Sequence, residues 1–409
     1  MTAAPVRDAT GLLDAARALR PTIAAQAEKI ERNGELPGSL VDALAAAGLF
    51  TMLVPRELDG AQVDPETCLR IIEEVSRADG SVGWCLHVGT SCSLSAGWLA
   101  PDAAREIWTG HPRVSLSGSA TSFGTAMAVD GGYRVSGRWG FASGCKHATW
   151  IIGTVNVYED GVHRIGPNGQ PESLFAFLPS EDCQILDTWD VTGMRGTGSH
   201  DFVVEGAFVP ERLMLPRSYA VAPWSSGPLY AFGGGAVPAA NGVVAASSPW
   251  VGQAAPGMAA VALGIARGAL DAFAELAAVK VPTRRDALLR DDPIVQTLFG
   301  RSEAKVRAAR AFLFETVADV WRTVVASGAG TSDGQAMIRL ASVHAAETAV
   351  EVVEALWRAA GTSAIVVGSP FERRLRDVMV ASQNVSISPM HIAGTGRVLL
   401  DRRRAEVGA

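Results

Sequence analysis

A chain of 409 residues, 48% of them hydrophobic and 19% charged, can bury a large core, so it is not a disordered protein. A formal net charge of −6 and a pI near 5.7 argue against a nucleic-acid-binding protein, which usually carries a basic face. The length accommodates two or three domains or one large subdivided enzyme.

The cysteines and histidines suggest neither a disulfide framework nor a metal site. The five cysteines are odd in number, form no CxxC pair, and have no histidine at metal-finger spacing from two of them. We therefore expect free thiols, a reducing cytoplasmic location and no metal. The first twenty residues also lack the basic and apolar segments of a secretory signal.

Residues 1–113 predict an N-terminal helical domain. The segment "LLDAARALRPTIAAQAEKIERNG" has helical apolar spacing and ends at Asn33 and Gly34, a helix-stop pair. Three further segments continue the pattern: "PGSLVDALAAAGLF", "DPETCLRIIEEVSRADGSVGWCLHVGTSCSLSAGWLA", which predicts two helices, and "APDAAREIW", with Pro101 in its first turn.

Residues 114–216 predict a central β domain. From about Val114 the sequence alternates small, polar and apolar residues, and Asp130, Gly131 and Gly132 form a hairpin-turn signal. Further strands are expected in "TWIIGTVNVY", "SLFAFLP" and "DFVVEGAFVP".

Residues 217–256 predict a Gly/Pro-rich connection. No charged residue occurs between Arg217 and Arg267, but five prolines interrupt this stretch. A membrane-spanning helix needs roughly 20 continuous apolar residues, so a buried helix behind a flexible loop is expected instead, and no membrane partner. The long uncharged segment from Trp224 to Gly257 is either a lid over a pocket or a disordered loop.

Residues 257–409 contain four long segments with helical periodicity, the last being "PFERRLRDVMVASQNVSISPMHIAGTGRVLL". Four helices with one apolar stripe each bury those stripes best against one another, as a bundle. The predicted fold is therefore α+β and mostly α: helical domain, β domain, C-terminal four-helix bundle.

The segment "DTWDVTGMRGTGSHDF", from Asp187 to Phe202, is rich in glycine and hydroxyl residues. A strand follows it rather than a helix, and no Lys follows its glycines, which excludes a dinucleotide fingerprint and a P-loop. Two interpretations stay open. Its N–H groups and hydroxyls face a ligand, or it is a tight turn with Arg195 in a surface ion pair.

Four motifs in this order resemble the acyl-CoA dehydrogenase superfamily over nearly the whole chain: "MLVPRELDG", "GGYRVSGRWGFASG", "DTWDVTGMRGTGSHDFVVEGAFVP" and "VALGIARGALDAF". The resemblance implies that a flavin lies between the β domain and the bundle. It also implies that the second and third motifs pass along the flavin.

Two departures argue against α,β-dehydrogenation of an acyl thioester, which needs a positioned carboxylate base. No Glu or Asp occurs between Asp377 and Asp401, and the strand end that usually reads like "TEP" is "SGSATS". The chain instead resembles the oxygenase components of two-component flavin-dependent monooxygenases. The resemblance implies use of O2 and reduced FMN or FAD from a separate NAD(P)H-dependent reductase. It also implies hydroxylation or oxidation of a medium-sized aromatic or secondary-metabolite substrate through a C4a-hydroperoxyflavin.

The "WxFxSG" pattern of these monooxygenases is matched by Trp139, Phe141, Ser143 and Gly144. A hydroxyl near flavin N5 can hydrogen-bond the reduced flavin and slow peroxide loss, and Ser143 is the candidate; otherwise it is a turn or cap serine. The same resemblance implies further cofactor contacts from the Gly-rich segment, at Trp189, Arg195, Gly196, Thr197, Gly198 and Ser199.

Other candidates face the substrate or assist the chemistry. The family's "QH" pair is here Gln383 and Asn384, and Asn384 cannot act as a general base; His391 lies two turns on and faces either the pocket or solvent. His87 either bonds a substrate oxygen or is a satisfied core residue. The remaining candidate substrate contacts are Trp84 and Ser119.

Arg284 and Arg285 stand roughly where the family has a phosphate-binding arginine, or else form an exposed helix start. In the family such contacts often come from a neighbouring subunit, which implies a homotetramer. Two alternative functions stay open: an FAD-dependent acyl-CoA dehydrogenase or oxidase with a relocated base, and a binding protein that kept the fold without flavin.

Overall fold

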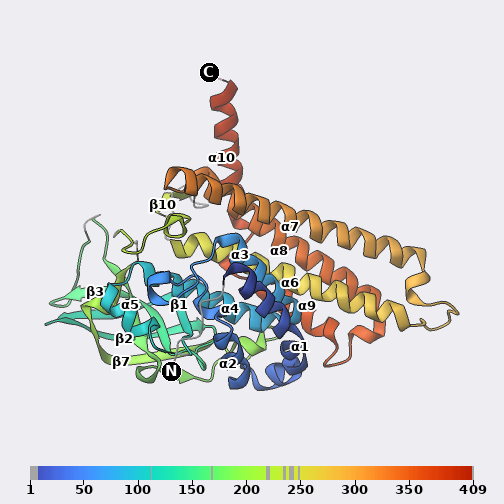
Figure 1. Cartoon of the computed structure of the whole chain (residues 1–409), viewed down its shortest axis with the longest axis horizontal. Helices are drawn as coiled ribbons and strands as arrows, with labels where there is room; N and C mark the ends of the chain where they lie inside the picture. The colour runs from blue at the N-terminus through green and yellow to red at the C-terminus, as the bar shows by residue number, and fades with distance from the viewer. Residues whose placement is uncertain are drawn as a thin grey trace.

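The computed structural model describes residues 8–111, 113–166, 169–217, 222–233, 236–238, 244–246 and 249–407. A β-sheet lies at one end of the molecule, and long C-terminal helices extend to the other end (Figure 1). The N-terminal helices lie in the middle of the molecule, between these two ends. The predicted order of helices, sheet and bundle is confirmed.

Among the described residues before the sheet, five α-helices form the N-terminal part. Helix α1 begins after Asp8, whose carboxylate caps it by accepting from Gly11 N at 2.8 Å, and ends at Gly34 with a φ of 65°. Helix α4 begins after Asp79, which accepts from Val82 N at 3.1 Å. The bounds are α1 Ala9–Asn33, α2 Gly38–Ala46, α3 Pro65–Ala78, α4 Gly80–Ser93 and α5 Pro101–Trp108.

The central sheet has the strand order β6-β7-β2-β1-β3-β5-β8, with β4 paired to β3. Strands β1 and β2 form the predicted hairpin across Asp130 and Gly131, while β1 and β3 pair in parallel and the other pairs are antiparallel. The bounds are β1 Leu116–Val129, β2 Gly132–Ala142, β3 Trp150–Glu159, β4 Val162–His163, β5 Ser173–Pro179, β6 Gln184–Leu186, β7 His200–Pro210 and β8 Met214–Pro216. A separate pair consists of β9 Ala236–Pro238 and β10 Val244–Ala246.

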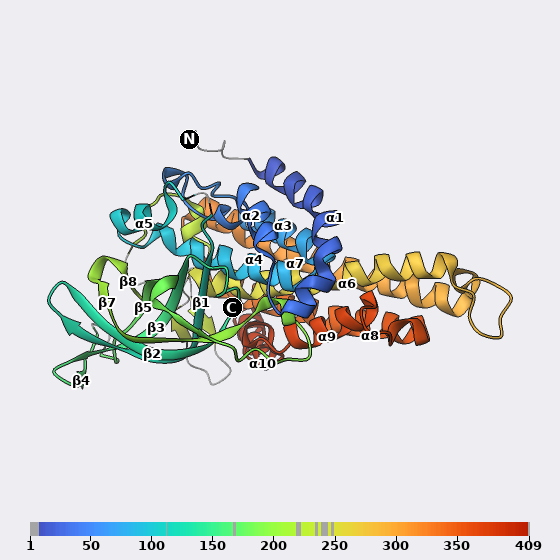
Figure 2. The same cartoon turned by 90° about the horizontal axis from the view of Figure 1, so that it is seen from below.

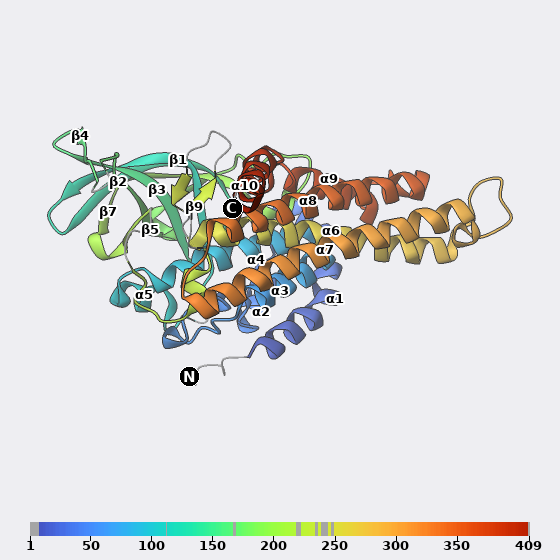
Figure 3. The ribbon, with the colours of Figure 1, turned by 90° about the horizontal axis from the view of Figure 1, so that it is seen from above.

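The C-terminal bundle contains α6, α7, α8 and α9, and the turn between α6 and α7 lies at the end farthest from the sheet (Figures 2 and 3). Helix α6 begins at Pro249, inside the segment predicted as a connection. It is long and apolar enough to cross a membrane, but 78% of its most apolar window is buried inside the protein, as a core helix would be. The bounds are α6 Pro249–Val279, α7 Pro293–Ser327, α8 Ser332–Ala360 and α9 Pro370–Ala381.

The last predicted helix is wrong as a single element. Helix α9 ends at Ala381, a short 3-10 turn η10 (Val385–Ile387) follows, and α10 (Met390–Val407) projects away from the body (Figure 1). Pro389 explains the break immediately before α10, because the residue before a proline avoids the helical conformation. Ser388 is accordingly extended, with φ −71° and ψ 139°.

Candidate active site

Three separate segments bring polar side chains together where α4 meets the sheet. The indole Nε1 of Trp84, on α4, donates to the Ser143 hydroxyl at 3.0 Å. Ser143 Oγ, in the turn after β2, lies 2.7 Å from Ser199 Oγ, which lies 2.7 Å from Thr197 Oγ1. All three hydroxyl residues are buried. We call Ser143, Ser199 and Thr197 the hydroxyl chain.

The Gly-rich segment is a tight, packed connection rather than an open loop. Met194 (φ 54°) and Gly198 (φ 49°) adopt the left-handed conformation on either side of a single 3-10 turn, η5 (Arg195–Thr197). A Cβ on Gly196 would lie 2.1 Å from a methyl group of Ile30, on α1. The Thr197 carbonyl accepts from Gly144 N at 2.8 Å, which joins this segment to the "WxFxSG" turn.

A carboxylate on a bundle helix holds this segment by a hydrogen bond to its backbone. Asp377, on α9, is 2% exposed and accepts from Met194 N at 2.6 Å. Burial and the nearby Asp79 raise the pKa of Asp377 to about 7. The sequence analysis did not identify Asp377 as a residue of the site. The available signal was an acidic residue next to the apolar Val378 on an amphipathic helix, where it could lie on the buried face.

Two aromatic side chains lie at the surface beside the hydroxyl chain. Phe141 has a φ of 61° and is 63% exposed, and its ring meets that of Trp189 edge-on with centroids 5.9 Å apart. Trp189 is half-buried, so the two rings together form a small apolar surface that a planar ligand can cover. A flavin ring system, planar and apolar with polar edges, fits such a surface beside hydroxyl groups.

One predicted cofactor contact needs correction. Trp139 is fully buried inside the sheet, where its Nε1 donates to the Thr154 carbonyl at 2.7 Å and its ring stacks on Phe202 with centroids 4.8 Å apart. In a regular strand Trp139 and Phe141, two positions apart, would point to the same face. The left-handed φ of 61° at Phe141 and a register irregularity between Trp139 and Ala142 break that pattern at the strand end. The Trp139 indole therefore belongs to the core and presents no surface to a flavin.

Arg195 takes part in ion pairs at the surface, as the alternative interpretation of the segment expected. Its guanidinium lies 3.7 Å from Glu31 and 3.8 Å from Asp190, and it donates to the Val191 carbonyl at 3.0 Å. These contacts explain its position without a ligand.

His87 and Ser119 are both buried with protein partners. His87 Nδ1 lies 3.3 Å from Ser91 Oγ, and burial lowers the pKa of His87 to about 4, so the imidazole is neutral at physiological pH. Ser119 donates its hydroxyl proton to the Gly140 carbonyl at 2.6 Å. Of the three candidate substrate contacts, Trp84 alone joins the hydroxyl chain.

Asn384 and His391 lie together at the junction of α9 and α10. Asn384 Oδ1 accepts from Ser386 N at 2.8 Å, and His391 Nε2 lies 2.7 Å from the Val385 carbonyl. Burial, with Arg339 nearby, lowers the pKa of His391. The recorded contacts of both residues are local, so their catalytic roles stay predictions.

Arg284 and Arg285 are exposed on the turn between α6 and α7, at the end of the bundle farthest from the sheet (Figure 3). Because this turn and the sheet lie at opposite ends of the molecule (Figure 3), contact with a flavin bound beside the sheet would require a neighbouring subunit. Of the predicted connection or lid, residues 217–256, the positions 218–221, 234–235, 239–243 and 247–248 lie outside the described residues. The described remainder contains a 3-10 turn (Pro228–Ala231), β9, β10 and the start of α6, so its role as a lid stays a prediction. Within the part of the chain that the structure describes, no cluster of His, Cys, Asp and Glu could hold a metal ion, and the five cysteines are free and buried.

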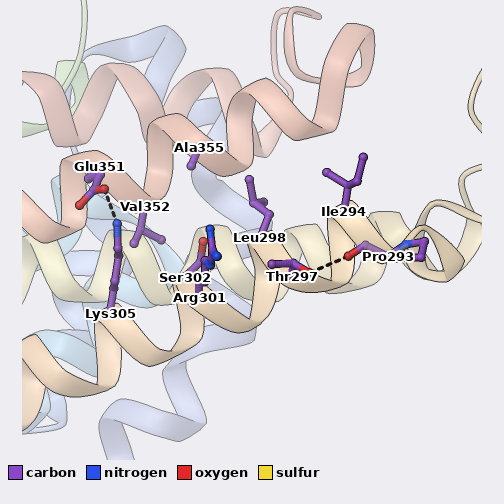
Figure 4. Close-up of a pocket in the computed structure, with 10 residues that line it drawn as sticks. All are labelled: Pro293, Ile294, Thr297, Leu298, Arg301, Ser302, Lys305, Glu351, Val352 and Ala355. Atoms are coloured by element: carbon purple, nitrogen blue, oxygen red, sulfur yellow. Dashed lines mark hydrogen bonds and ion pairs between the residues drawn. The ribbon is translucent and has the colours of Figure 1, made fainter.

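A groove with a volume of about 500 Å³ lies elsewhere, between α7 and α8 (Figure 4). Lys305 and Glu351 form an ion pair at one end of it, and Ile294, at the other, is 77% exposed. It holds none of the predicted site residues. Its position on the outer bundle face suits contact with another protein surface better than catalysis.

The fold and this site define a flavoprotein of the acyl-CoA dehydrogenase type, with an aromatic surface and hydroxyl groups where the sheet meets the helices. Two family models match the chain: the N-terminal domain of acyl-CoA dehydrogenases over residues 10–100 and the C-terminal domain over residues 256–389.

Characterised relatives align along most of the chain. An indole-3-acetate monooxygenase of Pseudomonas putida is 29% identical, covering 92% of this chain and 90% of its own. The oxygenase component of an FADH(2)-dependent resorcinol hydroxylase of Rhizobium sp. is 26% identical, covering 88% and 87%. The crystal structure of the 3-HSA hydroxylase from Rhodococcus sp. RHA1 has a TM-score of 0.81 at 27% identity, covering 95% and 96%.

The chain belongs to the acyl-CoA dehydrogenase superfamily, within its branch of flavin-dependent monooxygenases. It is an oxidoreductase, the oxygenase component of a two-component system.

Proposed function

We propose that the protein uses reduced FMN or FAD and O2 to hydroxylate or oxidise a medium-sized, largely apolar aromatic metabolite. When bound, the reduced flavin supplies the electrons that activate O2, so that one oxygen atom enters the substrate and the other leaves as water. The relatives' names support an aromatic substrate, since indole-3-acetate and resorcinol both contain an aromatic ring.

The observation that carries this proposal is the position of Ser143 beside exposed aromatic surface. Phe141 and Trp189 would contact the flavin ring, while Ser143 would hydrogen-bond its polar edge. The low exposure of Ser143, 6%, keeps that hydrogen bond away from bulk water. Exclusion of water is what an oxygen-activating flavin site requires.

The proposal includes two partners. A separate NAD(P)H-dependent reductase supplies the reduced flavin, as expected for a protein related to an oxygenase component.

A homotetramer would place Arg284 and Arg285 of one subunit near the flavin of another, and the groove between α7 and α8 (Figure 4) offers exposed apolar surface for such packing. Sedimentation of the wild type and of Ile294→Glu tests the assembly, which the added charge should weaken. The free cysteines agree with a cytoplasmic location.

The decisive experiment is a single turnover without substrate. The protein is mixed anaerobically with reduced FMN or FAD, oxygenated buffer is added, and oxidised flavin is followed by stopped flow with H2O2 measured at the end. A delayed appearance of oxidised flavin, compared with free flavin, supports the oxygenase. Oxidation at the rate of free flavin, together with reduction of bound FAD by an acyl-CoA, would instead identify a dehydrogenase with a relocated base.

A further inference from the structure

The direction of every hydrogen bond in the hydroxyl chain follows from its last member. Thr197 Oγ1 lies 2.8 Å from the Met194 carbonyl oxygen, and a carbonyl can only accept. Thr197 therefore donates its single hydroxyl proton to Met194. Its bond with Ser199 must then use a proton from Ser199.

The same count continues to Ser143. Because the Ser199 proton is used on Thr197, the bond between Ser199 and Ser143 must use the Ser143 proton. Trp84 Nε1 has a proton and no lone pair to share, so it donates to Ser143 as well. Ser143 Oγ is left with one lone pair and no proton for a ligand.

We propose that Thr197 and Ser199 are positioning residues that turn the Ser143 proton inward, so that Ser143 meets the flavin only as an acceptor. This rests on the proposed function, in which Ser143 faces flavin N5. Reduced flavin carries a proton on N5 and can donate, whereas oxidised flavin presents a lone pair there. The hydroxyl chain therefore selects the reduced cofactor through the direction in which the Ser143 proton points.

The Met194 carbonyl, which accepts the last hydrogen bond of the hydroxyl chain, is itself held in place. The Met194 carbonyl accepts from Trp189 Nε1 at 3.1 Å in addition to Thr197, and the Met194 N–H donates to the buried Asp377. Met194, whose carbonyl sets the direction of the hydrogen bonds in the hydroxyl chain, is thus fixed by contacts to both Trp189 and Asp377. Ser117 also donates to the Ser143 carbonyl at 2.9 Å, which holds the other end.

The test compares affinities for the two redox states, so it does not depend on turnover. Dissociation constants for oxidised and reduced FMN, and for oxidised and reduced FAD, are measured anaerobically for the wild type, Thr197→Val and Thr197→Ser. The wild type should prefer the reduced form. Thr197→Val keeps the shape but cannot accept from Ser199 or donate to Met194, which frees Ser199 and Ser143 to reverse.

The preference of Thr197→Val for reduced over oxidised flavin should fall about tenfold, the effect of one hydrogen bond, and Thr197→Ser should restore it. Ser199→Ala, which removes the acceptor for the Ser143 proton, should repeat the fall if the valine variant does not fold. Ser342→Ala is the matched control, because it removes a buried hydroxyl of α8 bonded to the Ile338 carbonyl. It should leave the preference unchanged.

Three outcomes separate the inference from the function on which it rests. A wild type that binds neither flavin in either state overturns both. A wild type that prefers reduced flavin, with the same preference within twofold in folded Thr197→Val and Ser199→Ala, overturns the positioning role alone. A fall in both variants that Thr197→Ser reverses establishes it.

Discussion

Asp377 and Met194, 183 residues apart in the chain, are joined by a 2.6 Å hydrogen bond from the Met194 N–H to a carboxylate that is 2% exposed. This bond connects the C-terminal bundle to the Gly-rich segment of the β domain. It lies directly behind the carbonyl that ends the hydroxyl chain. The Gly-rich segment is therefore held in place by a helix of the bundle.

The raised pKa of Asp377 makes stability depend on pH. The pKa of Asp377 is about 7 in the folded protein and ordinarily 3.8. Between pH 3.8 and pH 7 the native state therefore keeps a proton on Asp377 that the unfolded chain has lost. The stabilising contribution is full below about pH 4. The free energy of unfolding should fall as the pH rises through 7. Asp377→Asn keeps an acceptor for Met194 without titrating, so urea denaturation at pH 5 and pH 8 should show a smaller fall than in the wild type.

The control for this prediction concerns the groups around Asp377. Burial also raises the pKa of Asp79, and Glu31 and Arg373 contribute charge nearby. Asp377→Ala should be less stable than Asp377→Asn at both pH values, since it leaves the Met194 N–H without its partner. An identical pH dependence in the wild type and Asp377→Asn would assign the titration to Asp79.

Ser143→Ala should increase the fraction of reduced flavin that ends as H2O2 several-fold, because it removes the hydroxyl proposed to bond the flavin edge. The affinity for reduced flavin should fall by no more than about tenfold, the effect of one hydrogen bond, since the aromatic contacts remain. The measurement is product and H2O2 yield per flavin oxidised, with Ser342→Ala as the control. Unchanged coupling in Ser143→Ala would contradict the role of Ser143.

Phe141 and Trp139 belong to the same motif, but their substitution by alanine should affect different properties: flavin binding for Phe141 and the free energy of unfolding for Trp139. Phe141→Ala should weaken flavin binding about tenfold and change the free energy of unfolding by less than about 1 kcal/mol, because its ring is mostly exposed. Trp139→Ala should cost about 3–5 kcal/mol, because it empties a site in the core. Flavin titration and denaturant unfolding measure the two effects. Equal stability losses in the two variants would be inconsistent with this structure.

Gly193 allows no side chain. A Cβ there would lie 2.2 Å from the Arg376 carbonyl oxygen on α9, a backbone atom that cannot move alone. Gly193→Ala should therefore lower the free energy of unfolding by about 1–3 kcal/mol. Gly300→Ala, on α7, is the control: nothing lies within 4 Å of its Cβ position, and alanine favours a helix interior by up to about 1 kcal/mol. If both variants are stabilised, the close contact between the segment and α9 is wrong.

Local patterns were sufficient for most of the fold. The ends of α1 at Gly34 and of the β1–β2 hairpin at Gly131 depend on backbone conformations that glycine adopts easily, so they are visible in sequence. The short strands β4, β6 and β8, of two or three residues, carry too little alternation to be recognised. The break before α10 was missed although Pro389 marks it, because helical spacing continues on both sides.

The sequence by itself determined the kinds of residue available to the site: an aromatic motif, a glycine-rich segment with four hydroxyl side chains, and no acidic residue between Asp377 and Asp401. Tertiary structure decided which of them act together. It buried Trp139 and exposed Phe141, satisfied Arg195, His87 and Ser119 with protein partners, and brought Asp377 to Met194. It also set the direction of the hydroxyl chain. Hydrogen-bond partners are chosen by proximity in space, and segments more than a hundred residues apart meet only once the core has packed.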